Sequence, residues 1–496
     1  MARDGGDLTK YIENNDTPID SGNYNEVDGL VFAELSYSKF ENVTWTEDEL
    51  KNGVTVSEYA TKMLESGQVK AGTDQEKFFQ ALQSSDRYAD ATITNMEALN
   101  GNDYWSANET TKMSEDGQWA GMTIDIGDDT SVVAFRGTDG TELGWQEDLE
   151  LAYDPDGTTA QEAARDYLKN TDADHIYLTG HSKGGNDAES AYAMSDKDVR
   201  DRVDRVDNYD GPGNNDEFKE NYAEGYSELD DKQTNYMTEN AAIGKLLDEH
   251  PGETKIGQAD PSGHDFENAG PLGEHDPFSW KTGEDGESFL PGTQSEGSVD
   301  FDTILDETLE GMSPEEREDA VNALLKMGVA DDIANMDSKE LKDILKKAME
   351  GYGNLTDEEK DALKRLIGLL ILNAAVYYYD KKKAERNKKR NRNKKENGSA
   401  DGGHTRFWVD PDVLKKCICQ LEQAAKELNT NIRELEQVKD NLDGVIYILI
   451  RLVLDKIWLD LISERRRTKA LATTLDAILD YYIDTEERIV SEIKAA

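Results

Sequence analysis

A serine flanked by two glycines stands in the N-terminal half of the sequence. Residues 180–184 are Gly-His-Ser-Lys-Gly, the G-x-S-x-G pattern of a nucleophile elbow, a sharp turn that joins a strand to a helix. The apolar run 175–179 precedes the motif, and a helical pattern from Asn186 to Met194 follows it. The flanking glycines suit a turn in which the strand and helix backbones touch. Ser182 is therefore the candidate nucleophile.

A nucleophilic serine needs a general base, because its hydroxyl reacts weakly at neutral pH. The chain has six histidines, and His175 and His181 are too close to the serine in sequence to reach its hydroxyl. In hydrolases with this elbow the acid and then the histidine follow the serine, which leaves four positions: His250, His264, His275 and His404. We favour His275, in a turn-rich loop ahead of aromatic side chains. His264 comes next and His250 third, while His404 lies in a glycine-rich linker.

The acid that orients the histidine is harder to choose in a chain with 105 acidic residues. Asp210 follows an expected strand and precedes a Gly-Pro-Gly turn. That position would place its carboxylate at the carboxyl edge of a parallel sheet. Glu239 and Asp248 also lie between the elbow and His275. Asp210 is the first choice, and the other two acids stay open as alternatives.

Two backbone N–H groups are expected to stabilise the oxyanion that forms during acyl transfer. One belongs to Lys183, the residue after the nucleophile. The other should lie in the turn after the earlier strand 131–135, where the sequence continues Arg-Gly-Thr-Asp-Gly. We assign this second donor to Thr138, and we expect Arg136 to pair with an acid that braces the loop.

Residues 1–295 alternate short apolar runs with amphipathic helical stretches, a pattern typical of βαβ units. The runs 131–135 and 175–179 are short, apolar and followed by glycine-bearing turns, as buried parallel strands are. Residues 203–209 form a weaker third strand candidate. We therefore predict an α/β-hydrolase domain, a mostly parallel sheet with flanking helices.

Residues 301–379 predict short helices, with capping boxes at Ser313 and Thr356 and an apolar helix at the end. The apolar stretch spans about 14 residues, fewer than the roughly 20 that a bilayer span needs. The segment 380–403 is a linker that carries ten Lys or Arg in residues 381–395 and then becomes glycine-rich. The basic run is either a solvated tether or a contact for anionic lipid head groups.

Residues 404–496 have a helical pattern throughout, and we predict an all-α helical hairpin there. Apolar side chains recur every three or four residues from Leu414 to Leu442 and again from Leu471 to Ile489. Such a stripe, with little else to cover it, indicates a partner helix in this chain or in another protein. The only cysteines, Cys417 and Cys419, provide no disulfide framework.

The acidic excess lies almost entirely in the first 379 residues. The net charge is −50, while residues 380–496 contain 24 Lys or Arg and 21 Asp or Glu. Such a surface excludes nucleic acid as the expected partner, because phosphate binding needs clustered cations. We expect neither a metal nor a cofactor. The N-terminal residues lack the apolar core of a signal peptide, so we expect either retention in the cytoplasm or export by another route.

Together these motifs resemble the class 3 lipase superfamily, and within it the bacterial Mbeg1-like branch. The matching segments occur in order at residues 25–30, 35–37, 135–138, 144–148, 180–184, 210–213 and 275–280. The resemblance implies an α/β-hydrolase fold and hydrolysis of lipid esters, with Ser182 as nucleophile, His275 as base and Thr138 as oxyanion residue. Class 3 lipases usually carry their acid at a position that corresponds to Ala241 here. Either the acid has moved to Asp210 or Glu239, or the activity is weakened.

The helical tail from Val409 onward resembles the targeting modules of type VII secretion substrates. Tyr482 and Glu486 fit the short Tyr-x-x-x-Asp/Glu export signal of those systems. The resemblance implies secretion without a cleavable signal peptide and small helical partner proteins on the hairpin. For a toxin it also implies an immunity protein.

The leading hypothesis is a lipid acyl-ester hydrolase, of lipase or phospholipase type, exported as an effector. One alternative is a binding or scaffold protein that keeps the hydrolase fold with little activity, which the alanine at position 241 favours. Another is an intracellular lipase held at a membrane surface by the apolar helix and the basic run.

Overall fold

The computed structural model describes residues 4–107, 116–247, 250–266, 271–284, 286–327 and 354–363, and the single positions 365, 366, 369 and 373. The chain divides into two compact units, Met1–Tyr377 and Tyr378–Ala496. All described residues belong to the first unit. The predicted hairpin 404–496, the linker 380–403, both cysteines and most of the apolar helix lie outside the described residues.

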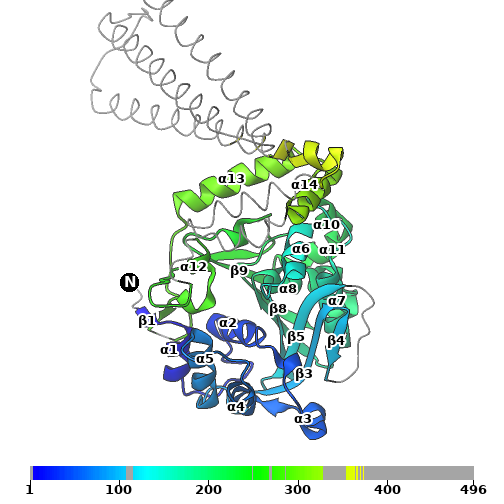
Figure 1. Cartoon of the computed structure of the whole chain (residues 1–496). Helices are drawn as coiled ribbons and strands as arrows, with labels where there is room; N and C mark the ends of the chain where they lie inside the picture. Colours follow the sequence, from blue (N-terminus) through cyan, green and yellow to red (C-terminus); the bar gives the residue numbers. More distant parts are fainter. Residues whose placement is uncertain are drawn as a thin grey trace, which may run out of the picture. The chain divides into compact units, whose positions relative to one another are not determined.

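A nine-stranded sheet forms the centre of the first unit (Figure 1). The order along the sheet is β10-β9-β8-β7-β6-β5-β3-β2, and β4 pairs with β3. These strands are β2 (Val54–Thr55), β3 (Thr92–Gly101), β4 (Asp103–Ser106), β5 (Gly117–Asp125), β6 (Thr130–Phe135), β7 (His175–His181), β8 (Val203–Tyr209), β9 (Gln233–Thr238) and β10 (Glu253–Gly257). A separate antiparallel pair consists of β1 (Asp4–Gly6) and β11 (Thr282–Gly283).

The sheet is mixed, so the expectation of a mostly parallel sheet is only partly correct. Strands β6 to β10 pair in parallel, whereas β2, β3, β4 and β5 pair antiparallel. The three predicted strands are β6, β7 and β8, which stand side by side in the parallel part. Their carboxyl ends therefore meet at one edge of the sheet, where ligands bind in open α/β sheets.

Helices cover both faces of the sheet, as an α/β fold requires (Figure 1). Helix α2 (Glu26–Leu35) packs on β6, β7 and β8 from one side. Helices α7 (Thr159–Asn170) and α8 (Lys183–Met194) pack on the opposite face, with α11 (Ala223–Leu229) behind α8. Two separate clusters of buried apolar side chains follow this division. One cluster includes Leu30 and Val31 of α2, and the other includes Ala188 and Ala191 of α8.

The other helices surround this core. Their bounds are α1 (Leu8–Asn14), α3 (Glu47–Asn52), α4 (Val56–Ser66), α5 (Asp74–Gln83), α6 (Glu142–Glu150), α9 (Lys197–Arg200), α10 (Asp216–Asn221), α12 (Pro271–His275), α13 (Glu296–Glu310) and α14 (Pro314–Lys326), with short 3-10 turns η1 (Phe40–Asn42), η2 (Ile243–Lys245) and η3 (Pro277–Ser279).

The predicted helix starts after the sheet domain are confirmed where the structure describes them. The side chain of Ser313 accepts from the backbone of Glu316 and caps α14, and Thr356 with Glu359 forms the same reciprocal box. Met312, Ala320 and Ala362 form a small apolar cluster between these segments. Within the part of the chain that is described, no helix is both long and apolar enough to cross a membrane.

Candidate active site

The turn between β7 and α8 forces Ser182 into a rare backbone conformation. Its φ is 57° and its ψ is −135°, and positive φ is uncommon for any residue but glycine. A Cβ atom on Gly180 would overlap the carbonyl oxygen of Gly184, and one on Gly184 would overlap that of Phe135. Both flanking glycines are therefore required by close backbone contacts. The strand–turn–helix arrangement expected at residues 180–184 is present.

Helix α8 begins at Lys183, three residues earlier than the helical pattern predicts. The sequence pattern does not predict this start, because Gly184 and Gly185 disfavour a helix unless tertiary packing stabilises it. Ser182 occupies the N-cap position, yet its side chain makes no capping hydrogen bond. The hydroxyl is thus not used to cap the helix that the elbow begins.

Asp210 lies beside the elbow because β8 is the parallel neighbour of β7. His181 is paired with Tyr209 across the two strands, and the Ser182 N–H donates to the Tyr209 carbonyl at 2.9 Å. Asp210 is the next residue, and its φ is 50°. The backbone therefore turns sharply after β7 and after β8 at the same level of the sheet, immediately after the last pair of residues that the two strands share.

His275, at the end of α12, contacts the Asp210 carboxylate. Its Nδ1 lies 2.7 Å from Asp210 Oδ2, while the Gly244 N–H donates to the other carboxylate oxygen at 3.1 Å. The Asp210 side chain is fully buried, and that of His275 is 16% exposed. A carboxylate accepts hydrogen bonds, so Nδ1 is the donor of this pair, and in a neutral imidazole Nε2 then keeps its lone pair. This is the tautomer that a general base needs.

Glu239, another acid considered from the sequence, makes other contacts. Glu239 accepts through its side chain from the Thr293 N–H at 2.9 Å and through its carbonyl from the Ser295 N–H, and so serves the segment before α13. Ala241 is buried, and its carbonyl accepts from Ser298. Asp248 lies outside the described residues. Asp210 is the acid that the described chain brings to His275.

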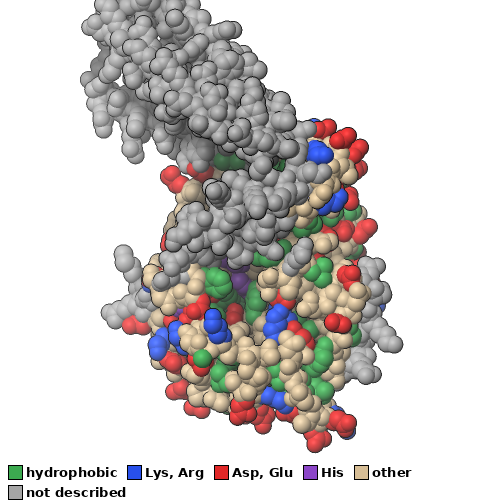
Figure 2. Space-filling model, in the orientation of Figure 1, with side chains coloured by type: hydrophobic (Ala, Val, Ile, Leu, Met, Phe, Trp, Pro, Cys, Tyr) green, Lys and Arg blue, Asp and Glu red, His purple; other side chains and the backbone are tan. Residues whose placement is uncertain are grey.

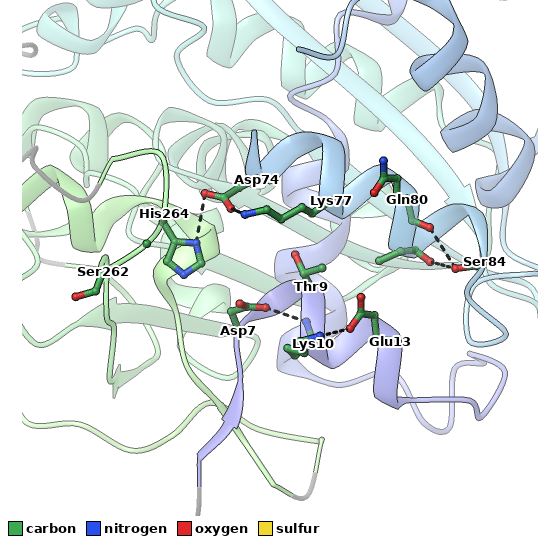
Figure 3. A pocket seen from close by; sticks show the side chains of 12 residues that line it. Asp7, Thr9, Lys10, Glu13, Asp74, Lys77, Gln80, Ser84, Ser262 and His264 are labelled. Carbon is green, nitrogen blue, oxygen red and sulfur yellow. Dashed lines mark hydrogen bonds and ion pairs between the residues drawn. The ribbon is translucent and has the colours of Figure 1, made fainter. Parts of the chain in front are cut away.

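The remaining described histidines engage other partners. His175 pairs with Asp204 at the far end of β7, and His250, whose side chain is 1% exposed, pairs with Glu189 of α8. His264 lies 3.3 Å from Asp74, on the wall of a polar pocket between α1, α5 and the 262–264 loop (Figure 3). His404 is outside the described residues. In Figure 2, histidine side chains are visible in a hollow of the face shown, beside hydrophobic side chains.

The loop after β6 packs against the elbow. A Cβ on Gly137 would lie 2.6 Å from the carbonyl oxygen of His181. The Thr138 hydroxyl donates to Asp148 Oδ2 at 2.5 Å, which ties the loop to α6. Arg136 forms an ion pair with Glu41 and braces the loop as expected. Lys183 is the first residue of α8, where helix geometry leaves the N–H without an intrahelical partner.

The side chain of Lys183 enters a buried cluster of acids that the sequence pattern does not predict. Its Nζ lies 3.0 Å from Glu147 Oε2, and these two side chains are 1% and 2% exposed. Burial lowers the pKa of the ammonium, but Glu147, Asp187 and Asp148 outweigh it and raise this pKa. The ammonium therefore stays charged. A lysine inside a glycine-rich elbow was the only signal for this cluster.

Two acids of the cluster hold their protons unusually tightly. Burial raises the pKa of Asp148 to about 6, although Lys183 and the Thr138 hydrogen bond oppose the rise. Burial also raises the pKa of Asp187 to about 8, against the attraction of Lys183. Among the described residues neither carboxyl oxygen of Asp187 has a hydrogen-bond partner. The cluster thus contains groups that titrate near neutral pH.

Comparison with known proteins connects this geometry to one family. Residues 96–326 match the model of the Mbeg1-like family, while no curated protein and no solved structure matches the chain. Within the described residues no group of three or more His, Cys, Asp or Glu is arranged to hold a metal ion. The matched segment contains Ser182, Asp210 and His275. Over this segment the chain is similar to the Mbeg1-like family, a lipase-like family.

Proposed function

We propose that this chain is a serine ester hydrolase that acts on lipid esters, with Ser182, His275 and Asp210 as its catalytic residues. The observation that carries the proposal is the 2.7 Å contact between His275 and Asp210 at the sheet edge where the Ser182 elbow turns. The family match supports the lipase-like chemistry. The three residues come from three separate segments of the chain, and a structural hydrogen bond alone would not need the strained serine beside it.

In the proposed mechanism Ser182 Oγ attacks the carbonyl carbon of the ester while His275 Nε2 takes the hydroxyl proton. Asp210 stabilises the imidazolium that forms. The N–H groups of Lys183 and Thr138 donate to the oxyanion. The tetrahedral intermediate then expels the alcohol, which receives the proton from His275, and leaves an acyl-enzyme. Water, deprotonated by His275, attacks the acyl carbon, and Ser182 recovers its proton as the fatty acid departs.

Hydrolysis of 4-nitrophenyl esters of increasing chain length, and fatty acid release from phosphatidylcholine vesicles, test this proposal. We expect Ser182→Ala to lower kcat by at least about a thousandfold. A matched control is Ser227→Ala, which alters an exposed serine on α11 and should leave the rate unchanged. Equal rates for the wild type and Ser182→Ala would refute the proposal that this chain is a serine ester hydrolase.

A fluorophosphonate probe separates this proposal from a binding protein that keeps only the fold. The probe forms a covalent bond with a serine that a neighbouring histidine activates. The lack of an acid at Ala241 favours such a binding protein. Asp210, however, supplies His275 with a carboxylate from a different position. We expect labelling of the wild type and none of Ser182→Ala. An unlabelled, correctly folded wild type would favour the binding protein.

We also propose that residues 404–496 direct export by a type VII route and bind small helical partner proteins. The support is the apolar periodicity of this segment and the Tyr482/Glu486 spacing. A cell that produces such an effector would also produce an immunity protein, which binds the effector and protects the cell. Secretion of the full chain should fall when Tyr482→Ala is introduced, while Tyr481→Ala serves as the neighbouring control. Equal secretion of both variants would leave membrane association through residues 363–396 as the better proposal.

A further inference from the structure

His181, the residue before the candidate nucleophile, is almost completely buried between two loops of the site. It is 3% exposed. Its Nε2 lies 2.8 Å from the carbonyl oxygen of His275, and its Nδ1 lies 3.0 Å from the hydroxyl of Tyr37. The rings of His181 and His275 also stack obliquely, with centroids 4.4 Å apart and planes at 38°. His181 therefore contacts both the backbone and the ring of the proposed base.

These contacts fix the proton positions on the His181 ring. A carbonyl oxygen can only accept, so Nε2 must carry the hydrogen that points to His275. Burial, together with the neighbouring His275, holds the pKa of His181 well below its usual value, although the bond to the His275 backbone opposes this. The ring is therefore neutral and Nδ1 is an acceptor. The Tyr37 hydroxyl is the donor that this nitrogen needs.

Tyr37 is well suited to this task. Burial, reinforced by Glu34 and Asp148, raises the pKa of the phenol well above its usual value, so the hydroxyl keeps its proton. The His181 carbonyl, 3.2 Å from the same hydroxyl, is the second acceptor within its reach. Tyr37 follows the end of α2, which packs on β7. Through Tyr37, His181 is thus connected to α2, which lies on the other side of β7 from α8.

We propose that His181 is a positioning residue for the general base: its Nε2–H holds the backbone of His275, and Tyr37 holds His181 in the tautomer that does so. This inference rests on the proposed function of Ser182 and His275. Without the contact, the hydrogen bonds among the described residues that would hold the end of α12 at this edge of the sheet are the Asp210 pair and the contacts of Glu274 with Asn240. A neutral ring has a second advantage, because a charged His181 would repel the imidazolium that forms on His275 during catalysis.

Two amide substitutions at position 181 test the Nε2–H donor separately from the contact that Nδ1 makes. In His181→Gln the side-chain nitrogen reaches about as far as Nε2 and can still donate to the His275 carbonyl. In His181→Asn the shorter amide can replace only the contact to Tyr37. His175→Gln is the matched control, since His175 lies at the opposite end of the same strand and pairs with Asp204. Far-UV circular dichroism and thermal melting establish that each variant is folded.

We expect His181→Asn to lower kcat for a short-chain 4-nitrophenyl ester by about 10- to 100-fold with little change in KM, because a small displacement of a catalytic group has effects of this size. The rate of fluorophosphonate labelling should fall in parallel. His181→Gln should recover most of the loss, and His175→Gln should match the wild type. A purely structural role would instead lower the melting temperature of both His181 variants without this difference in kcat.

The proposal is overturned if folded His181→Asn keeps the wild-type kcat, or if His181→Gln and His181→Asn lose kcat equally. If neither His181 variant folds, Tyr37→Phe decides, because it leaves the ring in place and removes only the donor to Nδ1. A several-fold loss of kcat at constant KM supports the proposal, and an unchanged kcat contradicts it. An active Ser182→Ala would refute the proposed function, whereas an inactive Ser182→Ala with a fully active His181→Asn would refute only the role of His181.

Discussion

Asp210 is held by its backbone as well as by its side chain. A φ of 50° lies in the left-handed region, which Asp and Asn tolerate better than other residues with a side chain. Its N–H donates to the Tyr236 carbonyl at 2.7 Å, and its two carboxylate oxygens contact His275 and Gly244. Asn is therefore the substitution that preserves the turn and removes the charge.

We predict that Asp210→Asn lowers kcat by about a thousandfold or more, because a neutral amide favours the wrong histidine tautomer and cannot stabilise the imidazolium. Glu239→Gln should keep the wild-type rate, since that acid serves the segment before α13. Steady-state hydrolysis of a short-chain ester measures both. If Glu239→Gln shows the larger loss, the acid has been misassigned.

The buried carboxyl of Asp187 predicts a dependence of stability on pH. Its pKa is about 8 in the folded chain and about 4 when exposed, so the folded state binds the proton more tightly. This contribution to stability is complete below about pH 4 and is lost as the pH rises towards 8. Asp187→Asn, which cannot ionise, should gain about 3–4 kcal/mol relative to the wild type between pH 5 and pH 8.

Urea unfolding at the two pH values measures this gain. Asp198→Asn, which changes an exposed acid on α9, is the control and should follow the wild type at both. A constant difference between wild type and Asp187→Asn would mean that Asp187 is ionised throughout this range.

At the scale of elements, the sequence predicts three neighbouring strands of the parallel part of the sheet and misses the other strands. Strands β6 and β7 are recognisable because apolar side chains dominate them, whereas β8 buries Asp207 and Asn208 and is the weaker candidate. Strand β9 contains buried Gln233 and Asn235, which look like turn residues in the sequence. Their amide nitrogens donate to Glu189 of α8 and to the Pro251 carbonyl, partners that only the folded chain supplies.

The ion pair of Glu147 and Lys183 beside the elbow belongs to a set of contacts that joins α6 to three other elements. Glu147 of α6 accepts from the Gln118 N–H of β5, from the Ala160 N–H of α7 and from Lys183 at the start of α8, each at 3.0 Å. Lys183 also donates to the Gln118 carbonyl. Removing the ammonium would leave the Glu147 carboxylate buried without its counter-charge, a situation that costs more than the pair itself contributes.

We therefore predict that Lys183→Met destabilises the fold by about 3–5 kcal/mol, and that adding Glu147→Gln recovers much of this loss. The backbone N–H of residue 183 is unchanged, so the folded fraction of Lys183→Met should retain activity. A double-mutant cycle from urea unfolding gives the coupling energy. Additive losses in the double variant would show that the two side chains do not stabilise each other.

At the scale of the whole molecule, the order of residues suggests which side chains form the site, but only the fold brings them together. The motif identifies Ser182, and the order of residues makes Asp210 and His275 reasonable partners. The contact itself depends on β8 being the neighbour of β7 and on α12 returning to that edge across the 65 residues that separate the pair. Local periodicity predicts neither fact, and the same holds for Tyr37, which reaches His181 from 144 residues away.

The charge of the molecule predicts how salt affects its stability. A net charge of −50 makes self-repulsion a cost of compactness, which counter-ions reduce as the screening length falls from about 30 Å at 0.01 M to about 10 Å at 0.1 M. We expect the melting temperature to rise by several degrees over this range and then to level off. NaCl and KCl should act alike, because screening depends on ionic strength. A melting temperature that stays constant, or that rises only with sulfate, would mean that repulsion is negligible and that salts act by exclusion from the surface.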